Sequence, residues 1–100
     1  MIVRLAAEGV VVRDADDLGR LRLQTDLEAE AVRTALVTTG TGELIDTDTA
    51  WLDVAVLRSR AALLAKLPDW PQRWRVMIDE AERNGRLSSD GRALRVPIER

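Results

Sequence analysis

Hydrophobic and polar residues over the first 24 positions follow the pattern of β-strands. Two β-branched runs, IVRL at 2–5 and VVVR at 10–13, are separated by Ala-Ala-Glu-Gly, and turn-forming residues cluster at 14–19. Residues 20–24 then alternate between polar and apolar side chains, which places Leu21 and Leu23 on one face of a half-buried strand. We therefore expect residues 1–24 to form N-terminal strands.

Residues 25–56 have the pattern of a helix followed by a hairpin. The helix is expected to begin near Thr25 or Asp26, either of which can accept a hydrogen bond from a free N–H group of the first turn. Its buried face would carry Leu27, Ala31, Val32, Ala35 and Leu36, and it would end at Gly40 and Gly42. A short strand at 43–45, a polar turn at 46–49 and a second strand at 51–56 would complete this unit.

A linking helix at 57–67, ended by Pro68, precedes a second helix–hairpin unit at 68–98. Asp69 is expected to begin the second helix, with Pro71 in its first turn and Asn84-Gly85 at its end. Its buried stripe would be Trp70, Trp74, Met77, Ile78 and Ala81. Residues 86–98 are interpreted as a hairpin, and Pro97, which has no N–H group to donate, suggests that its last strand lies at a sheet edge.

The two units resemble each other at an offset of 42 to 43 residues. Gly42-x-Leu44 matches Gly85-x-Leu87, and the alternating segment WLDVAV at 51–56 matches ALRVPI at 93–98. The match favours a strand over a helix for 51–56, which periodicity alone leaves open. Gene duplication and convergent patterning both explain the likeness.

These patterns predict an α+β fold in one small domain spanning residues 1–100. It would contain about three helices, short antiparallel β-hairpins, a duplicated helix–hairpin (αββ) unit and a winged-helix-like C-terminal half. A chain of 100 residues with 46% hydrophobic content is large enough to bury a core of its own. It lacks Phe and Tyr, so its three Trp residues are expected to supply bulk to that core.

The absence of Cys and His excludes whole classes of chemistry. Disulfides, thiol nucleophiles, Ser-His-Asp triads and zinc sites with Cys or His ligands cannot be built from this chain. The Asp-Thr-Asp-Thr turn at 46–49 lacks the glycine and the distal glutamate of a calcium loop. The glycines at 40 and 42 close a helix rather than open one, which is the wrong geometry for phosphate. We therefore expect no metal, no cofactor and no catalytic residue.

Aromatic residues and sheet edges are the remaining candidates for binding. Trp51 would point away from Leu52 if 51–56 is a strand, and Trp70 lies at a helix start between Asp69 and Pro71. Trp51, Trp70 and the strand that contains Pro97 are the predicted interaction residues. The first hypothesis is a non-enzymatic protein-interaction module, with a homodimer as one form of it.

A DNA-binding protein is the alternative hypothesis. Residues 55–98 resemble the helix-turn-helix plus wing of the broad winged-helix class, although no specific motif carries the likeness. The residues that would contact phosphate are Arg73, Arg75, Arg86, Arg92 and Arg95. Against this hypothesis, the net charge of −2 is not the electrostatic footprint of a nucleic-acid binder, and acidic residues share the same helix.

Two further expectations concern chemistry and location. An enzyme that uses carboxylates would need two of them in one cleft, and no pair in the sequence predicts such a cleft. No segment approaches the roughly 20 apolar residues of a membrane span, and the N-terminal segment is interrupted by Arg4 and Glu8. We expect a cytoplasmic protein that binds neither membrane nor metal.

Overall fold

The N-terminal segment forms strands, as the sequence pattern predicts. The computed structural model describes all residues from 1 to 100, and β1 (Ile2–Ala6) forms an antiparallel hairpin with β2 (Gly9–Arg13). A short 3-10 helix, η1 (Leu18–Arg20), leads into β3 (Arg22–Thr25), which pairs in parallel with β1. Alternation places Val3, Leu5 and Leu23 in the core. The predicted inward position is thus confirmed for Leu23, whereas Leu21 precedes β3 and is only partly buried.

The first helix, α1 (Ala29–Thr38), begins later than predicted. Thr25 belongs to β3 instead, where its hydroxyl donates to the carbonyl of Leu5 at 3.0 Å and accepts from the N–H of Leu27 at 3.1 Å. A residue held in this way inside a sheet cannot begin the helix. The predicted buried face is confirmed for Val32, Ala35 and Leu36. It is wrong for Ala31, which is exposed, and for Leu27, which precedes α1 and is partly buried.

The prediction of one strand over 51–56 is wrong in its second half. After β4 (Gly42–Leu44), strand β5 (Thr49–Asp53) ends at Asp53, and α2 (Val54–Leu64) begins at the next residue. The carboxylate of Asp53 accepts the N–H of Val56 at 2.9 Å, which stabilises the first turn of α2. Val54 and Val56 are therefore helical where the matching residues 96 and 98 are in a strand, and the predicted duplication is not confirmed.

The third helix, α3 (Trp70–Arg83), has nearly the predicted bounds. Trp70 and Trp74 are both buried, with ring centroids 5.4 Å apart, and Trp70 donates its indole N–H to the carbonyl of Ala15 at 2.8 Å. Trp70 was a predicted interaction residue, and its burial in the core contradicts that role. In a chain without Phe or Tyr, the core takes its aromatic bulk from these two residues.

The last strand, β6 (Ala93–Glu99), is central rather than at an edge. The strand order of the six-stranded mixed sheet is β2-β1-β3-β6-β5-β4, with β6 parallel to β3 and antiparallel to β5. The N–H of Ile98 donates to the carbonyl of Asp48 on the β5 side. Successive N–H groups of a strand point to opposite sides, so the nitrogen of Pro97 faces β3, and β6 pairs with β3 only from Ile98 onward. Proline is tolerated there because no ladder bond is lost.

The predicted wing is not a separate hairpin. Residues 86–98 contain one isolated bridge, between Leu87 and Leu94, and β6 then joins the sheet along β5. Leu94 and Val96 lie opposite Leu52 and Ala50, and all four are buried. The apolar residues of β6 therefore belong to the core of the domain and not to a projecting wing. The winged-helix arrangement is accordingly not confirmed.

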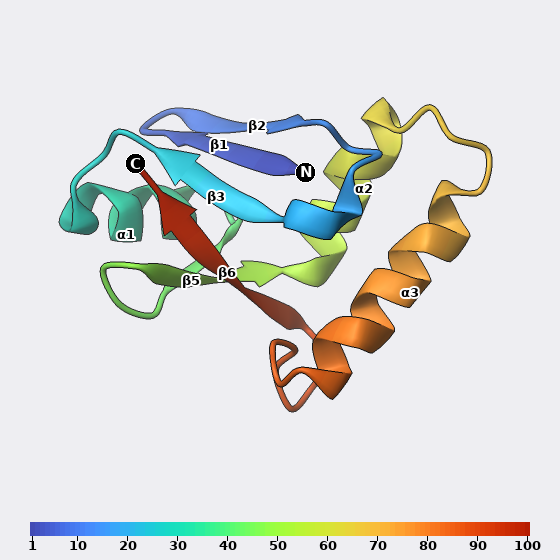
Figure 1. Cartoon of the computed structure of the whole chain (residues 1–100). Helices are drawn as coiled ribbons and strands as arrows, with labels where there is room; N and C mark the ends of the chain where they lie inside the picture. The colour runs from blue at the N-terminus through green and yellow to red at the C-terminus, as the bar shows by residue number, and fades with distance from the viewer.

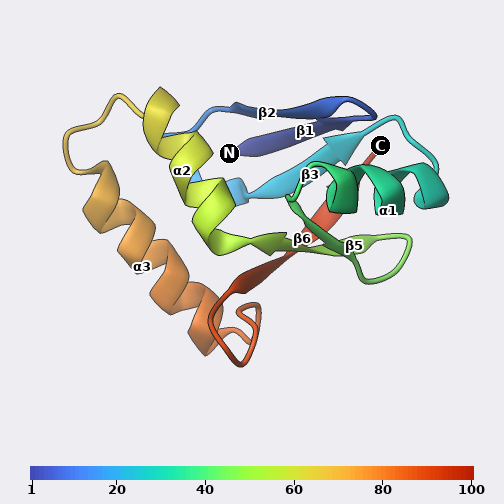
Figure 2. The same cartoon turned by 180° about the vertical axis from the view of Figure 1, so that it is seen from behind.

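Helices cover one face of the sheet only. Figure 2 shows α1 and α2 in front of the strands, whereas no helix crosses the strands in Figure 1. Helix α3 lies beyond the end of the sheet on the side of α2 (Figure 1). None of the three helices is both long enough and apolar enough to cross a bilayer.

Candidate functional site: an apolar patch at the β2 edge

Strand β2 forms one of the two edges of the sheet, and it is unusually apolar for an edge. It pairs with β1 on one side and has no strand on the other (Figure 1). Its sequence, GVVVR, places three consecutive valines at the edge, and the side chain of Val11 is 56% exposed. Unpaired N–H and C=O groups beside exposed apolar side chains are a template for pairing with another strand.

Helix α2 adds exposed leucines next to this edge. Leu57 and Ala61, one turn apart, face the core, and Leu63 lies about 200° around the helix from Ala61 and points to solvent. Leu63 is 87% exposed and Leu64 is 51% exposed. A leucine exposed to this degree loses the burial free energy of roughly 1.5–3 kcal/mol that it gains inside a protein.

The strand and the helix together form a shallow apolar groove of about 250 Å³. We call its lining the β2–α2 patch, and its residues are Val10, Val11, Val12, Arg60, Leu63 and Leu64. Five of the six are aliphatic, and the groove contains no pair of reactive side chains. A concave apolar surface beside an unpaired strand suits the binding of a polypeptide better than chemistry on a small substrate.

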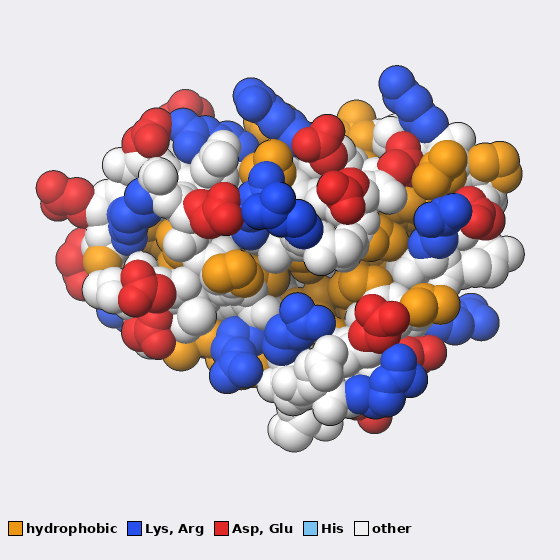
Figure 3. Space-filling view, viewed as in Figure 1, with side chains coloured by type: hydrophobic (Ala, Val, Ile, Leu, Met, Phe, Trp, Pro, Cys, Tyr) orange, Lys and Arg blue, Asp and Glu red, His pale blue; other side chains and the backbone are white.

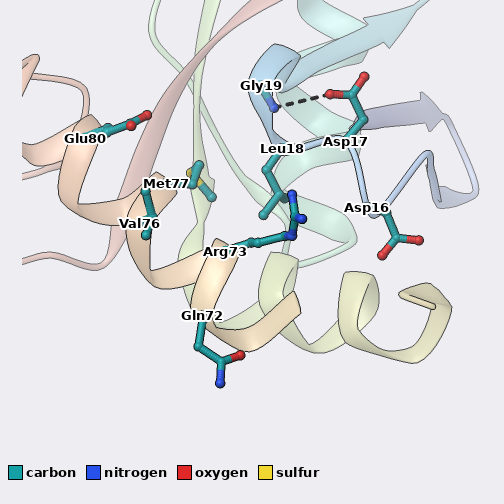
Figure 4. Close-up of a pocket in the computed structure, with 9 residues that line it drawn as sticks. All are labelled: Asp16, Asp17, Leu18, Gly19, Gln72, Arg73, Val76, Met77 and Glu80. Carbon is teal, nitrogen blue, oxygen red and sulfur yellow. Dashed lines mark hydrogen bonds between the residues drawn. The ribbon is translucent and has the colours of Figure 1, made fainter. Parts of the chain in front are cut away.

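A second hollow lies between α3 and η1, on the side of the molecule that faces the viewer in Figures 1 and 3. Figure 3 shows apolar side chains gathered in a depression near the centre of this view. The largest cavity, of about 410 Å³, has Leu18, Val76 and Met77 on its walls, and Figure 4 shows the side chains of Leu18 and Met77 directed into it. Polar residues form the rest of the lining.

Most charged groups of this hollow already have structural partners. The carboxylate of Asp16 accepts the N–H groups of Lys66 and Leu67 at 3.1–3.2 Å. Asp17 accepts the N–H of Gly19 at 3.3 Å, the bond drawn in Figure 4. Arg73 is paired with Asp69 at 2.9 Å. These bonds hold the loops between β2, η1 and α3, and they leave no acid–base pair in the cavity.

Trp51 lines a third, more polar hollow of about 230 Å³. The residue is half-buried on the helix-free face of the sheet, opposite Glu43 on β4 and Arg95 on β6. The predicted orientation, opposite to Leu52, is therefore confirmed. Asp53, which also lines this hollow, is engaged at the start of α2.

Two aspartates with perturbed pKa values hold turns of the sheet. The N–H of Asp48 and the hydroxyl of Thr49 donate to Asp46 and hold its pKa below the ordinary value of 3.8. The hydroxyl of Ser88 and the N–H of Arg92 do the same for Asp90. Both carboxylates are solvent-exposed and act as turn caps, so their pKa shifts mark structure rather than an acid–base site.

The predicted phosphate-binding arginines are dispersed. Arg73 lines the α3–η1 hollow, Arg92 lines the Trp51 hollow, and Arg95 projects from the sheet beside Trp51. Arg75 and Arg86 are exposed on α3 and directly after it. On the helix-free face, Arg4 and Arg22 form ion pairs with Asp26 at 2.6 Å and Glu99 at 2.9 Å, and Figure 3 shows basic and acidic side chains interspersed. No continuous basic stripe results.

Sequence reasoning missed the residues of the β2–α2 patch. It placed the open edge at Pro97, which lies on a central strand with its side chain exposed on the helix-free face. The available signal was the run of three valines at 10–12, which is not interrupted by a polar residue, together with the pair Leu63-Leu64 outside the buried spacing of α2. No group of three or more acidic side chains converges to hold a metal ion.

Comparison with known proteins identifies no relative. The chain matches no protein-family model, and it has no significant counterpart among curated proteins or among solved structures.

Proposed function

We propose that this chain is a non-enzymatic protein-interaction module that binds its partner through the β2–α2 patch. The observation that supports this most directly is the coincidence of an unpaired strand with exposed leucines, of which Leu63 is 87% exposed. A partner strand added to β2 would supply the missing main-chain hydrogen bonds, and side chains from the same partner would cover Leu63 and Leu64.

A photo-crosslinking experiment tests this proposal. A photoreactive amino acid replaces Leu63 in the patch, and the matched control replaces Val37, which is 65% exposed on α1 and outside the patch. After illumination in an extract of the source organism, we expect protein adducts at position 63 and few at position 37. Adducts no more frequent at position 63 than at position 37 would rule out the patch as the binding surface.

The winged-helix-like DNA-binding alternative has no specific observation in its favour. Of the arginines that it requires, Arg73 and Arg92 lie in separate hollows and Arg75 is exposed on α3. The segment proposed as a wing is part of the central sheet. Phosphate contacts strengthen as salt falls, so titration of duplex DNA at low ionic strength is the sensitive test. We expect no salt-dependent binding.

A further inference from the structure

The sequence of β2 complements itself, and this points to the partner that the patch accepts. Resting on the proposed function, we propose that two copies of this chain pair through antiparallel β2 strands, with a two-fold axis at Val11. The two six-stranded sheets would then form one continuous sheet. An isologous pairing of this kind closes on itself as a dimer and does not continue into a fibre.

The main-chain hydrogen bonds of the hairpin select this pairing. Ala6 and Gly9 flank the two-residue turn and form the hydrogen-bonded pair that closes it. Bonded and non-bonded pairs alternate along an antiparallel ladder, so the N–H and C=O groups of Val10 and Val12 point to the free side. With the axis at Val11, Val10 of one copy faces Val12 of the second copy, and their free groups bond to each other.

The side chains agree with the same register. Every valine of β2 then meets a valine, Val11 on the helix-free face and Val10 with Val12 on the covered face. A slip of two residues is the smallest that keeps the faces aligned. It would place a valine opposite Glu8 in one direction and opposite Asp14 in the other. The register centred on Val11 therefore buries the most apolar surface.

The charged residue of β2 fits the same register. Arg13 lies opposite Gly9 of the second copy, and symmetry repeats the arrangement at the other end. Glu8 and Asp14 would come opposite each other only beyond the ends of β2, so no like charges face each other within the paired strands. A Cβ built on Gly9 meets no heavy atom within 4 Å, so there is open space for the long side chain of Arg13.

Helix α2 supplies apolar area that the strands alone lack. The two-fold axis places both copies of α2 on the same face of the joined sheet, where Leu63 and Leu64 of each copy can be covered. Two strands of five residues give an interface near the small end of specific complexes. We therefore expect a reversible dimer with a dissociation constant of roughly micromolar size.

Single-cysteine variants test the register, because the chain contains no cysteine of its own. Val11→Cys places one thiol beside its own copy across the axis, within the reach of a disulfide. Under mild oxidation we expect Val11→Cys to form a covalent dimer at least about tenfold faster than Val37→Cys, the exposed control on α1. Equal rates for the two variants, or fastest linkage in Val10→Cys, would overturn the proposed register.

The mass of the unmodified chain tests the dimer independently of the thiols. Sedimentation equilibrium should show a monomer–dimer equilibrium, and Leu63→Glu should raise its dissociation constant at least about tenfold. A strict monomer at high micromolar concentration would overturn the second-copy inference. The proposed function would survive that result if position 63 still crosslinked to a different protein, and it would fall if position 63 crosslinked to none.

Discussion

The two edges of the sheet, β2 and β4, are protected to different degrees. Strand β4 has three residues, carries the charged Glu43 in its centre and packs against α1. Strand β2 has five residues with three valines in a row, and its end near α2 is bordered by exposed leucines. Short length, charge and cover are the devices by which proteins keep edge strands from pairing. Both edge strands pack against a helix, β4 against α1 and β2 against α2, so short length and a central charge are what distinguish β4 from β2.

This difference is the basis of our proposal that β2 is used for association, whereas β4 only closes the sheet. The β4–β5 turn is further held by Asp46, whose carboxylate accepts three hydrogen bonds from Asp48 and Thr49. The β1–β2 turn, at Ala7 and Glu8, has no such side-chain cap. The β4 edge is stabilised by contacts within the chain, whereas the β2 edge is expected to be stabilised by a partner.

Substitution of a glycine at each edge should give the largest difference in stability between the two edges. A Cβ at Gly42 would lie 1.9 Å from the carbonyl oxygen of Trp51, so Gly42→Ala must displace β4 from β5. We expect it to lower the free energy of unfolding by about 3 kcal/mol. Gly9→Ala at the other edge meets no atom within 4 Å and should change stability by less than about 0.5 kcal/mol. Urea unfolding of both variants gives the comparison, and equal losses would contradict it.

A lysine placed at each edge should affect association at β2 only. Val11→Lys introduces a charge into the apolar patch, and we expect the dissociation constant of the self-associated form to rise at least about tenfold. Glu43→Lys at the β4 edge is the matched control and should leave it unchanged. Light scattering over a concentration series measures both. A similar effect from Glu43→Lys would show that β4 contributes to the interface.

Removal of the Asp53 carboxylate at the junction between β5 and α2 should have an intermediate effect on stability. Asp53→Ala removes the carboxylate that accepts the N–H of Val56, and we expect a loss of about 1 kcal/mol in the free energy of unfolding. Because α2 carries Leu63 and Leu64, the same variant should also weaken self-association slightly. Asp53→Asn keeps an acceptor oxygen and should recover most of the loss in thermal unfolding.

The smallest expected effect is the acid sensitivity of the β4–β5 turn. The lowered pKa of Asp46 means that its ionised form is favoured in the folded state. Its contribution to stability is therefore fully present above the ordinary value of 3.8 and is lost as the pH falls through the lowered pKa. Thermal unfolding between pH 5 and pH 2 should show a shallower decline for Asp46→Asn than for the unmodified chain. Identical slopes would mean that Asp46 does not stabilise the turn through its charge.

Local pattern determined much of this protein. Runs of β-branched residues predicted the strands β1 and β2, alternation predicted most of β3, and helical spacing with Asp69, Pro71 and Gly85 predicted α3 almost to the residue. Composition alone excluded thiol and imidazole chemistry. These features depend on residues that are close together in the chain, and for that reason a single sequence contains them.

Tertiary structure decided which strands are neighbours and which apolar residues remain exposed. Pro97 suggested an edge, yet β6 is central, with β3 and β5 as its neighbours. Proline is accommodated there because its missing N–H falls where no ladder bond forms. Trp70 was predicted to be available for binding, yet it is buried against Trp74 and bonded to Ala15, which is distant in the sequence. Val11 is exposed because its strand lies at an edge, and Leu63 and Leu64 are exposed on α2, whereas Val12 of the same strand is buried. Pairing between distant segments depends on the whole chain, and periodicity does not encode it.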